Sequence, residues 1–401
     1  MTVLPWLLVP GAIAVVAAAI ELAARWWLRH RTHYYVLPPG LRLRLRPDPA
    51  VFPQLESDVR FEVNRDGERG DEPPRSGAGL CRILVLGGSQ PEGYLLDQDT
   101  AWPGALQRLL ESPVHLARLR AERVHVGNIA RSGVGSEGLD LILQRVLPRY
   151  PRLQAIVILV GASDVLRWLE AGAPPAPPPP VRIDDLFRSH PEVRCGWRPR
   201  ELAVVELLRR LRLRRLRPVE RNDCACRWIG RARAMRAKAR QIQVMPDPAP
   251  MLAHFDWHLR RALRRAKDHA DRVIVVRQPW FGPPHTADED AHMWHGAVGR
   301  AWQEEVTTVY SLDVLARLMS LLDAKASRIA RELDVEQLEL NGLLDRGLQT
   351  YYDTFHATPA GARIVATAVA ATLLRQPLES LTTDPAIVAA KAAPVELQKI
   401  S

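Results

Sequence analysis

Residues 82–93 read RILVLGGSQPEG, and this stretch decides the fold. The run from Ile83 to Leu86 is wholly apolar, which is typical of a strand buried on both faces, as in a parallel sheet. Two glycines end the run, and Ser89 follows them directly. Ligands of open α/β sheets bind at the carboxyl ends of the strands, so the pattern predicts that the Ser89 hydroxyl lies at that edge. Taken alone, Ser89 is better explained as the N-cap of the next helix.

Strands and helices alternate along much of the remaining chain, in the βαβ order of a parallel sheet. Further strands are predicted at 123–128, 155–160, 272–276 and 335–340. Helices are predicted from residue 99, at 136–147, from residue 162, and at 255–269, 312–333 and 360–374. The carboxyl ends of parallel strands share one edge, so the loops at Ser89, Gly133 and Ser163 should gather there. Trp280 follows the fourth strand and is predicted either to wall a substrate pocket at this edge or to belong to the core.

A second chemical signal lies near the end of the chain. Asp353 and His356 are three residues apart, just ahead of an Ala-rich helix. A serine, an imidazole base and an orienting carboxylate are the parts of a nucleophilic hydrolase. The sequence therefore predicts Ser89, His356 and Asp353 as one catalytic group.

The N-terminal segment is apolar and long enough to cross a bilayer. Residues 1–20 carry no charge, and a Trp26-Trp27 pair flanked by Arg25 and Arg29 follows, as at a membrane interface. We interpret it as an uncleaved, single-pass anchor in the cell membrane. A cleaved signal peptide is the main alternative, although basic residues ahead of the segment and a small-residue cleavage site are not evident. The side of the membrane on which the catalytic domain lies stays open.

Composition changes along the chain suggest six segments. They are an anchor (1–30), a Pro/Gly-rich lead-in that packs on the core and has no chemistry of its own (31–80), the first part of a catalytic domain (81–170), a Pro-rich linker with an Arg-rich helical insertion (171–250), the second part of the domain (251–380) and a tail (381–401). A short strand is expected at 60–64 within the lead-in.

The chain is basic, with a formal net charge of +10 over 401 residues. Part of this charge lies in the Arg-rich insertion, which we interpret as basic amphipathic helix. Such a helix is either a solvated surface or a contact with anionic lipid headgroups. Nucleic acid is not an expected partner, because no binding motif is present. Cys224-x-Cys226, with His190 upstream, has no second ligand pair at suitable spacing, so neither a metal nor a cofactor is expected.

The order of these motifs resembles the SGNH (GDSL-type) hydrolase family. Gly87-Gly88-Ser89 is similar to its nucleophile block, with Gly88 in place of an aspartate. Gly133 matches the glycine of the second block. Residues 161–164, Gly-Ala-Ser-Asp, match the third block with Ser163 in place of asparagine, and residues 353–356 match the final D-x-x-H. Together, the pattern and the resemblance predict a three-layer, flavodoxin-like α/β/α sandwich around a five-stranded parallel sheet, with an N-terminal transmembrane helix and a basic helical insertion.

The resemblance implies a serine esterase. Ser89 would attack an acyl ester, and Ser89, Gly133 and Ser163 would form the oxyanion hole. The expected substrates are acyl esters, including O-acetyl esters, of carbohydrate or lipid. Two alternatives remain open: transfer of the acyl group to another hydroxyl, and a non-catalytic scaffold of the same fold at the membrane.

Overall fold

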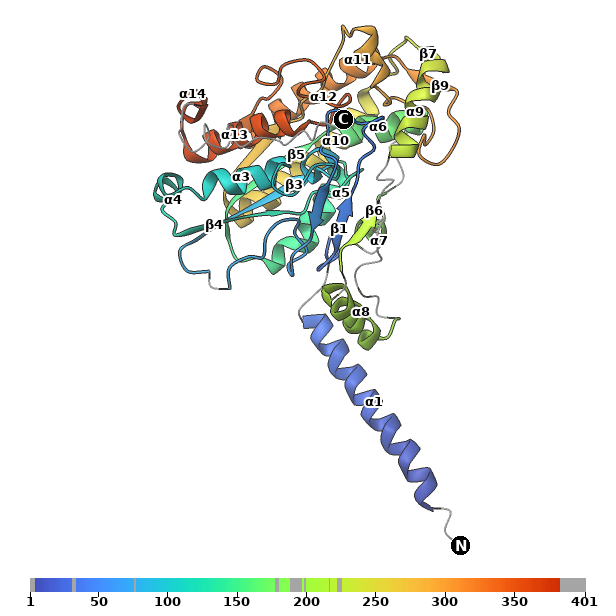
Figure 1. Ribbon diagram of the computed structural model, residues 1–401, viewed down its shortest axis with the longest axis vertical. Coiled ribbons are helices and arrows are strands. Elements are labelled where there is room, and N and C mark those ends of the chain that lie inside the picture. The colour runs from blue at the N-terminus through green and yellow to red at the C-terminus, as the bar shows by residue number, and fades with distance from the viewer. Residues whose placement is uncertain are drawn as a thin grey trace, which may run out of the picture.

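A five-stranded parallel sheet forms the centre of the protein (Figure 1). The computed structural model describes residues 4–30, 34–75, 77–176, 180–187, 197, 200–215, 217–221 and 226–382. The sheet strands are β3 (Leu80–Gly87), β4 (Arg123–Asn128), β5 (Leu153–Val160), β8 (Ala270–Arg277) and β10 (Glu336–Leu338). Their order in space is β10-β8-β5-β3-β4, with parallel neighbours throughout. Numbered along the chain, this is the flavodoxin-like order 2-1-3-4-5, which confirms the predicted fold.

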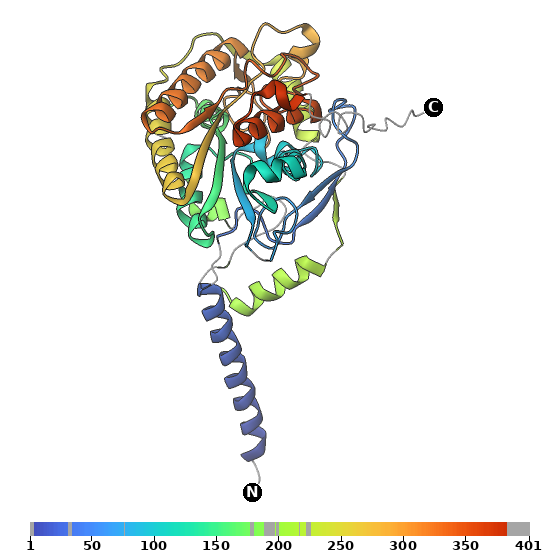
Figure 2. The same cartoon turned by 90° about the vertical axis from the view of Figure 1, so that its left-hand side faces the viewer.

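Helices cover both faces of the sheet, giving three layers (Figure 2). One layer contains the mutually packed α5 (Ser136–Val146), α6 (Ala162–Glu170), α10 (Ala249–His269) and α12 (Leu312–Glu332). The other contains α3 (Trp102–Leu110), α4 (Pro113–Leu119), α13 (Pro359–Leu374) and α14 (Leu378–Thr382). The helix from residue 99 begins three residues later than predicted, because Ala101 is the N-cap and Pro103 occupies the first turn.

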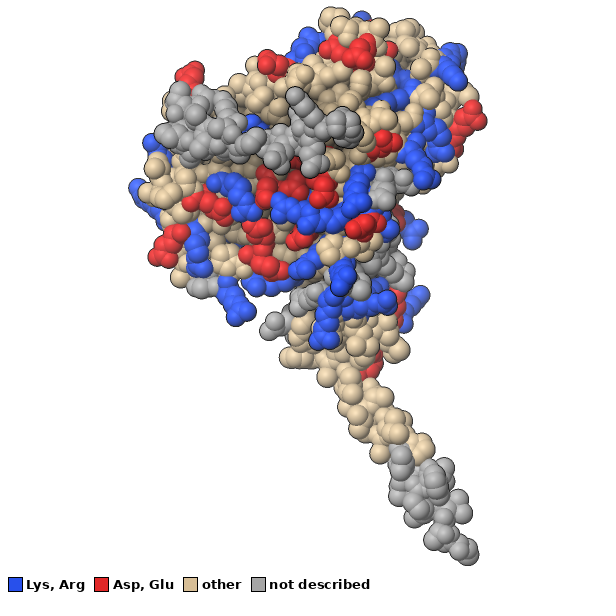
Figure 3. Space-filling view, viewed as in Figure 1, with Lys and Arg blue, Asp and Glu red and all other residues tan. Residues whose placement is uncertain are grey.

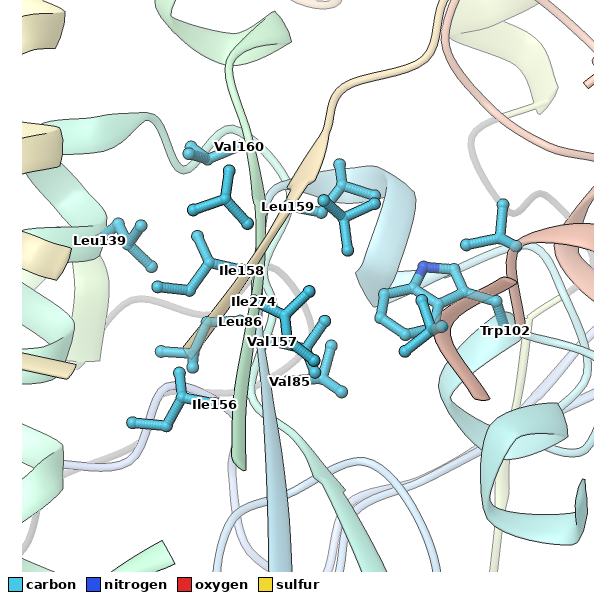
Figure 4. Packing of buried hydrophobic residues seen from close by; sticks show 14 of the residues in the cluster. Val85, Leu86, Trp102, Leu139, Ile156, Val157, Ile158, Leu159, Val160 and Ile274 are labelled. Atoms are coloured by element: carbon cyan, nitrogen blue, oxygen red, sulfur yellow. The ribbon is translucent and has the colours of Figure 1, made fainter. Parts of the chain in front are cut away.

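Side chains of the central strands pack alternately into the two helical layers. Val85 and Val157 point toward Trp102, whereas Ile156 and Ile158 point toward Leu139 (Figure 4). All six side chains are fully or almost fully buried. Burial on both faces explains why these strands are continuously apolar instead of alternating with polar residues.

The N-terminal helix α1 (Leu4–His30) projects from the body as a single rod (Figure 1). Its stretch Pro10–Leu28 has a mean hydropathy of 1.5, and little of it is covered by the rest of the protein. The exposed length is largely uncharged in the space-filling view, and basic side chains gather where the rod meets the body (Figure 3). The chain thus has an N-terminal helix long and apolar enough to cross a membrane, a property that a signal sequence shares.

The lead-in and the insertion are more closely joined to the body than the sequence suggested. Strand β1 (Arg42–Leu45) is the middle of a small sheet and pairs with β2 (Val59–Glu62) on one side and with β6 (Val219–Arg221) of the insertion on the other. Strand β7 (Arg240–Ile242) pairs in parallel with β9 (Thr308–Tyr310). The expected strand near 60–64 is therefore present, shifted by one or two residues. These pairings join segments far apart in sequence, which local patterns do not reveal.

The insertion contains two basic helices, as predicted. Helix α8 (Ala203–Arg215) packs against α1, and α9 (Cys226–Lys238) packs on the body. Three further helices are short: α2 (Ser89–Glu92), α7 (Ile183–Phe187) and α11 (Ala287–Ala291). His190, Cys195, Cys224 and residues 383–401 lie outside the described residues. The six-segment division of the chain stays a prediction.

Candidate active site

Ser89 stands at the carboxyl end of β3, as the sequence predicted. Strand β3 ends at Gly87, where φ is +153° and a Cβ would lie 1.9 Å from the carbonyl oxygen of Leu159. Only glycine fits this approach of β3 to β5, and the chain turns there directly into α2. Ser89 is the first residue of α2, so its backbone N–H has no partner within that helix.

Ser89, His356 and Asp353 form a continuous hydrogen-bonded chain. Oγ of Ser89 lies 2.7 Å from Nε2 of His356, and Nδ1 of His356 lies 2.8 Å from Oδ2 of Asp353. Residues 89 and 356 are 267 positions apart in sequence, so the fold alone brings them together. The Asp353 carboxylate also accepts hydrogen bonds from the backbone N–H groups of Phe355 and His356, which fixes the turn that carries the imidazole.

The environment keeps Asp353 ionised. Its side chain is fully buried, and burial alone would raise its pKa. The adjacent His356 imidazole, then His295 and the hydrogen bonds, outweigh burial and hold the pKa well below its usual range. A carboxylate in this state can fix the imidazole tautomer and stabilise its protonated form.

Two neighbouring aromatic residues support this carboxylate, and sequence reasoning missed both. Nε1 of Trp294 donates to Oδ2 of Asp353 at 2.9 Å. His295 stacks on Trp294 with ring centroids 3.7 Å apart, and burial together with His356 and nearby arginines lowers its pKa to about 3. His295 is therefore neutral at ordinary pH. Trp294 and His295 do not stand at a characteristic spacing from Asp353 in the sequence. The signal that could have pointed to them was two adjacent polar aromatic residues in a loop.

Three loops meet beside the serine. They are the loops at Ser89, Gly133 and Ser163, which were predicted to gather at this edge. Gly133 has φ of +75° and a Cβ there would contact nothing, so its loop leaves open space. A Cβ on Gly88 would lie 3.3 Å from Ser163 Oγ and 3.3 Å from the carbonyl oxygen of Val134. Gly88 and Ser163 thus share one small volume, and a longer side chain at position 88 would press on both loops.

Two carboxylates hold the Gly133 loop from either end: the buried Glu92 and the partly buried Asp164. Glu92 accepts hydrogen bonds from the backbone N–H and the hydroxyl of Ser132. Asp164 accepts from the backbone N–H and the hydroxyl of Ser136, the latter at 2.6 Å. Burial raises the pKa of both carboxyls, and these serine contacts oppose the rise. The loop is therefore anchored on α2, which begins at Ser89, and on α6.

Arginines from the lead-in and the insertion reach this edge. The buried guanidinium of Arg69 donates to the carbonyl oxygens of Gly93 and Leu96, just beyond α2. Arg233 of α9 donates to the carbonyl oxygen of Tyr352, next to Asp353. Arg69 of the lead-in therefore positions the segment after the serine. The expectation that the lead-in has no chemistry of its own stays a prediction.

Trp280 lies on the loop after β8, at the predicted edge. Its backbone N–H donates to the Asn341 side chain, and its indole packs beside Gly282 and against the main core. The next residue, Phe281, donates its N–H to the carbonyl of Thr354, which joins this loop to the D-x-x-H turn. A role for Trp280 in a substrate pocket stays a prediction.

His295, Asp353 and His356 are close enough to share a metal ion. Both ring nitrogens of His356 are already engaged, one with Asp353 and one with Ser89. The hydrogen-bonded chain therefore accounts for these side chains without a metal.

No protein-family model matches this chain. No curated protein matches it in sequence either. Among solved structures, Axe2, an acetylxylan esterase from Geobacillus stearothermophilus, matches with 12% identity and a TM-score of 0.40, over 74% of this chain and 95% of that chain. LAE5, described as an alpha/beta hydrolase enzyme from the metagenome of Lake Arreo, Spain, matches with 15% identity and a TM-score of 0.38, over 74% and 95%. These likenesses are distant.

Proposed function

We propose that this protein is a membrane-anchored serine esterase of SGNH type that cleaves acyl esters of carbohydrate or lipid. The observation that carries the proposal is the unbroken contact from Ser89 Oγ through His356 to Asp353 at the carboxyl edge of the sheet. The open loop at Gly133, fixed by two carboxylates beside that serine, supports it.

The roles follow from the contacts. Oγ of Ser89 attacks the ester carbonyl carbon while Nε2 of His356 takes the hydroxyl proton. Backbone N–H groups of Ser89 and Gly133, with the Ser163 hydroxyl, stabilise the negative charge that develops on the carbonyl oxygen. When the carbon–oxygen bond to the alcohol breaks, His356 returns the proton to the departing oxygen. Water then attacks the acyl-serine by the same route and releases the acid.

Replacing the nucleophile tests the proposal directly. Ser89→Ala should abolish hydrolysis of p-nitrophenyl acetate and labelling by a fluorophosphonate probe, because it removes the hydroxyl that is hydrogen-bonded to Nε2 of His356. Ser320→Ala, which removes an exposed serine hydroxyl on α12, should leave both unchanged. A Ser89→Ala protein that still hydrolyses the ester at the wild-type rate would sink the proposal. A wild-type protein that neither hydrolyses esters nor reacts with the probe would favour the scaffold.

Hydrolysis and transfer use the same acyl-serine intermediate. Adding an acetylated oligosaccharide together with an unacetylated acceptor, and following the acyl group by mass spectrometry, distinguishes release of acetate from formation of a new ester. The proposed esterase should release acetate.

The contacts of α1 support an anchor that is retained in the mature protein. Ala24 and Leu28 are buried against Trp197 and Ala203 in a small apolar cluster. The Glu21 carboxylate accepts hydrogen bonds from the first two backbone N–H groups of α8, at 2.8 and 3.1 Å. Cleavage of α1 would expose the cluster and leave these helix donors without their acceptor.

Helix α8 is proposed to lie on the membrane surface. It packs against the body-proximal end of α1, and its sequence carries arginines among leucines and valines. Leu202, Val205 and Leu208 are each more than half exposed, in the manner of an interfacial helix that contacts lipid. The nearby arginines would contact anionic headgroups.

A further inference from the structure

Two histidines and two carboxylates face one another between α5 and α10, outside the hydrogen-bonded chain of Ser89. His254 and His258 are four residues apart on α10, so they share one helix face, and their ring centroids are 4.5 Å apart. Glu137 and Asp140 are three residues apart on α5. The paired helices bring Nε2 of His254 to 3.5 Å from Oε2 of Glu137, and Nδ1 of His258 to 3.6 Å from Oδ2 of Asp140.

The two histidine–carboxylate distances are longer than hydrogen bonds and closer to the distance between two ligands of one metal ion. A direct hydrogen bond from an imidazole N–H to a carboxylate is expected at about 2.7–2.9 Å. Glu137, His254 and His258 each offer one ligand atom, and these atoms all lie within 4.8 Å of one another. Zinc ligands at about 2.0–2.1 Å in a tetrahedron lie roughly 3.4 Å from one another. The separation between His254 and Glu137 matches that edge.

A second observation also indicates a missing ligand. Nδ1 of His258 is buried and makes no hydrogen bond among the described residues, although Oδ2 of Asp140 faces it at 3.6 Å. A buried polar nitrogen without a hydrogen bond is costly. A metal ion on the other ring nitrogen would fix the proton on Nδ1, where the Asp140 carboxylate can accept it. A cavity beside the cluster is lined by Glu137, His254, Met251 and Asp164, among others, and gives an ion a path to it.

We propose that Glu137, His254 and His258 bind a divalent transition metal ion, zinc being the best fit, with water as the fourth ligand. Two histidines and one carboxylate form a common zinc ligand set. Asp140 is held by Nε of Arg261 at 2.9 Å and Nε of Arg265 at 2.8 Å, so it is already neutralised. It therefore serves as the outer carboxylate that orients His258 and not as a ligand.

The ion would stabilise the layer that carries the oxyanion loop. Glu137 follows Ser136, whose N–H and hydroxyl are bound by Asp164 of α6. A metal shared by α5 and α10 would tie both helices together directly behind that contact. Arg167 also lines the cavity, and its positive charge would weaken binding, so we expect a structural ion of modest affinity.

Zinc binding by tag-free, full-length protein in detergent tests this inference. After treatment with a chelator, titration calorimetry with zinc chloride should give one site per chain, and zinc should raise the melting temperature. The double variant His254→Gln/His258→Gln should lose the site, and Asp140→Asn should weaken binding about 10- to 100-fold. His292→Gln, which removes an exposed histidine, and Cys224→Ser, which disrupts the C-x-C motif, should bind as the wild type does.

Several results would overturn the inference. One is a wild-type chain that binds no stoichiometric zinc, which would mean that the histidines only form ion pairs with the carboxylates. Another is a double variant that keeps the site with unchanged affinity. Circular dichroism without metal checks that the variants fold, and if the double variant does not fold, His254→Gln alone provides the comparison. None of these measurements depends on esterase activity, so the outcome is separate from that of the proposed function.

Discussion

At the scale of single residues, Ser163 is the side chain that we propose as the third donor to the oxyanion. Its hydroxyl lies in the space that Gly88 leaves empty, where a carboxamide would be the usual donor of the family that the motifs resemble. Ser163→Ala should lower kcat for p-nitrophenyl acetate about 100-fold with little change in KM, because a donor to the transition state is lost. Ser163→Asn should keep at least the wild-type rate. An unchanged kcat in Ser163→Ala would assign the third donor elsewhere.

Glu92 should make stability depend on pH in a defined direction. Burial raises its pKa in the folded protein, so the folded state binds this proton more tightly than the unfolded chain does. Stability from this group is greatest in acid, and it falls as the pH rises through the usual carboxyl range toward the raised pKa. Glu92→Gln imitates the protonated form, and should therefore melt a few degrees above the wild type at pH 8.

Differential scanning fluorimetry between pH 5 and pH 8 compares the melting temperatures of the wild type and Glu92→Gln. The difference in melting temperature should shrink as the pH falls and the wild-type carboxyl takes up its proton. Asp353 has the opposite behaviour, since its lowered pKa gives stability that is lost only as the pH falls toward strong acid. Asp353 is present in both proteins, so its contribution cancels from the difference in melting temperature. Exposed Glu305→Gln is the control, and a Glu92→Gln protein less stable than the wild type at pH 8 would contradict the argument.

At the scale of elements, α8 provides a direct test of contact with the membrane. A polarity-sensitive dye on Leu208→Cys should shift its emission to the blue when full-length protein is reconstituted in vesicles containing phosphatidylglycerol. The same dye on Leu321→Cys, an exposed leucine on α12 of the body, should not shift. Both variants carry serine at Cys195 and Cys224 to restrict labelling. Equal emission at the two positions would show that α8 lies in water.

The elements of the core were predictable because their signals are local. Strand β5 is a continuous apolar run, and α10, α12 and α13 have clear helical patterns, so their positions were predicted to within a few residues apart from the start of α10. Ser89, Gly133, Ser163, Asp353 and His356 could be found because each follows a strand or matches a spaced motif. The contribution of Trp294 and the contact of Arg69 behind α2 were missed, because both depend on long-range packing. The same holds for β1 and β6, which pair across more than 170 residues.

At the scale of the whole molecule, the reactive edge and the apolar rod lie at opposite ends. Trp294 and Arg233, which hold the Asp353 turn, belong to the region of α11 and α9, far from α1 along the long axis (Figure 1). If α1 is embedded in a bilayer, the nucleophile stands off from the lipid by most of the height of the body. Ester groups at the depth of the acyl chains are then out of reach. A flexible polymer that extends from the surface into solution can bring its ester groups to that height, which favours carbohydrate over bilayer lipid as the substrate.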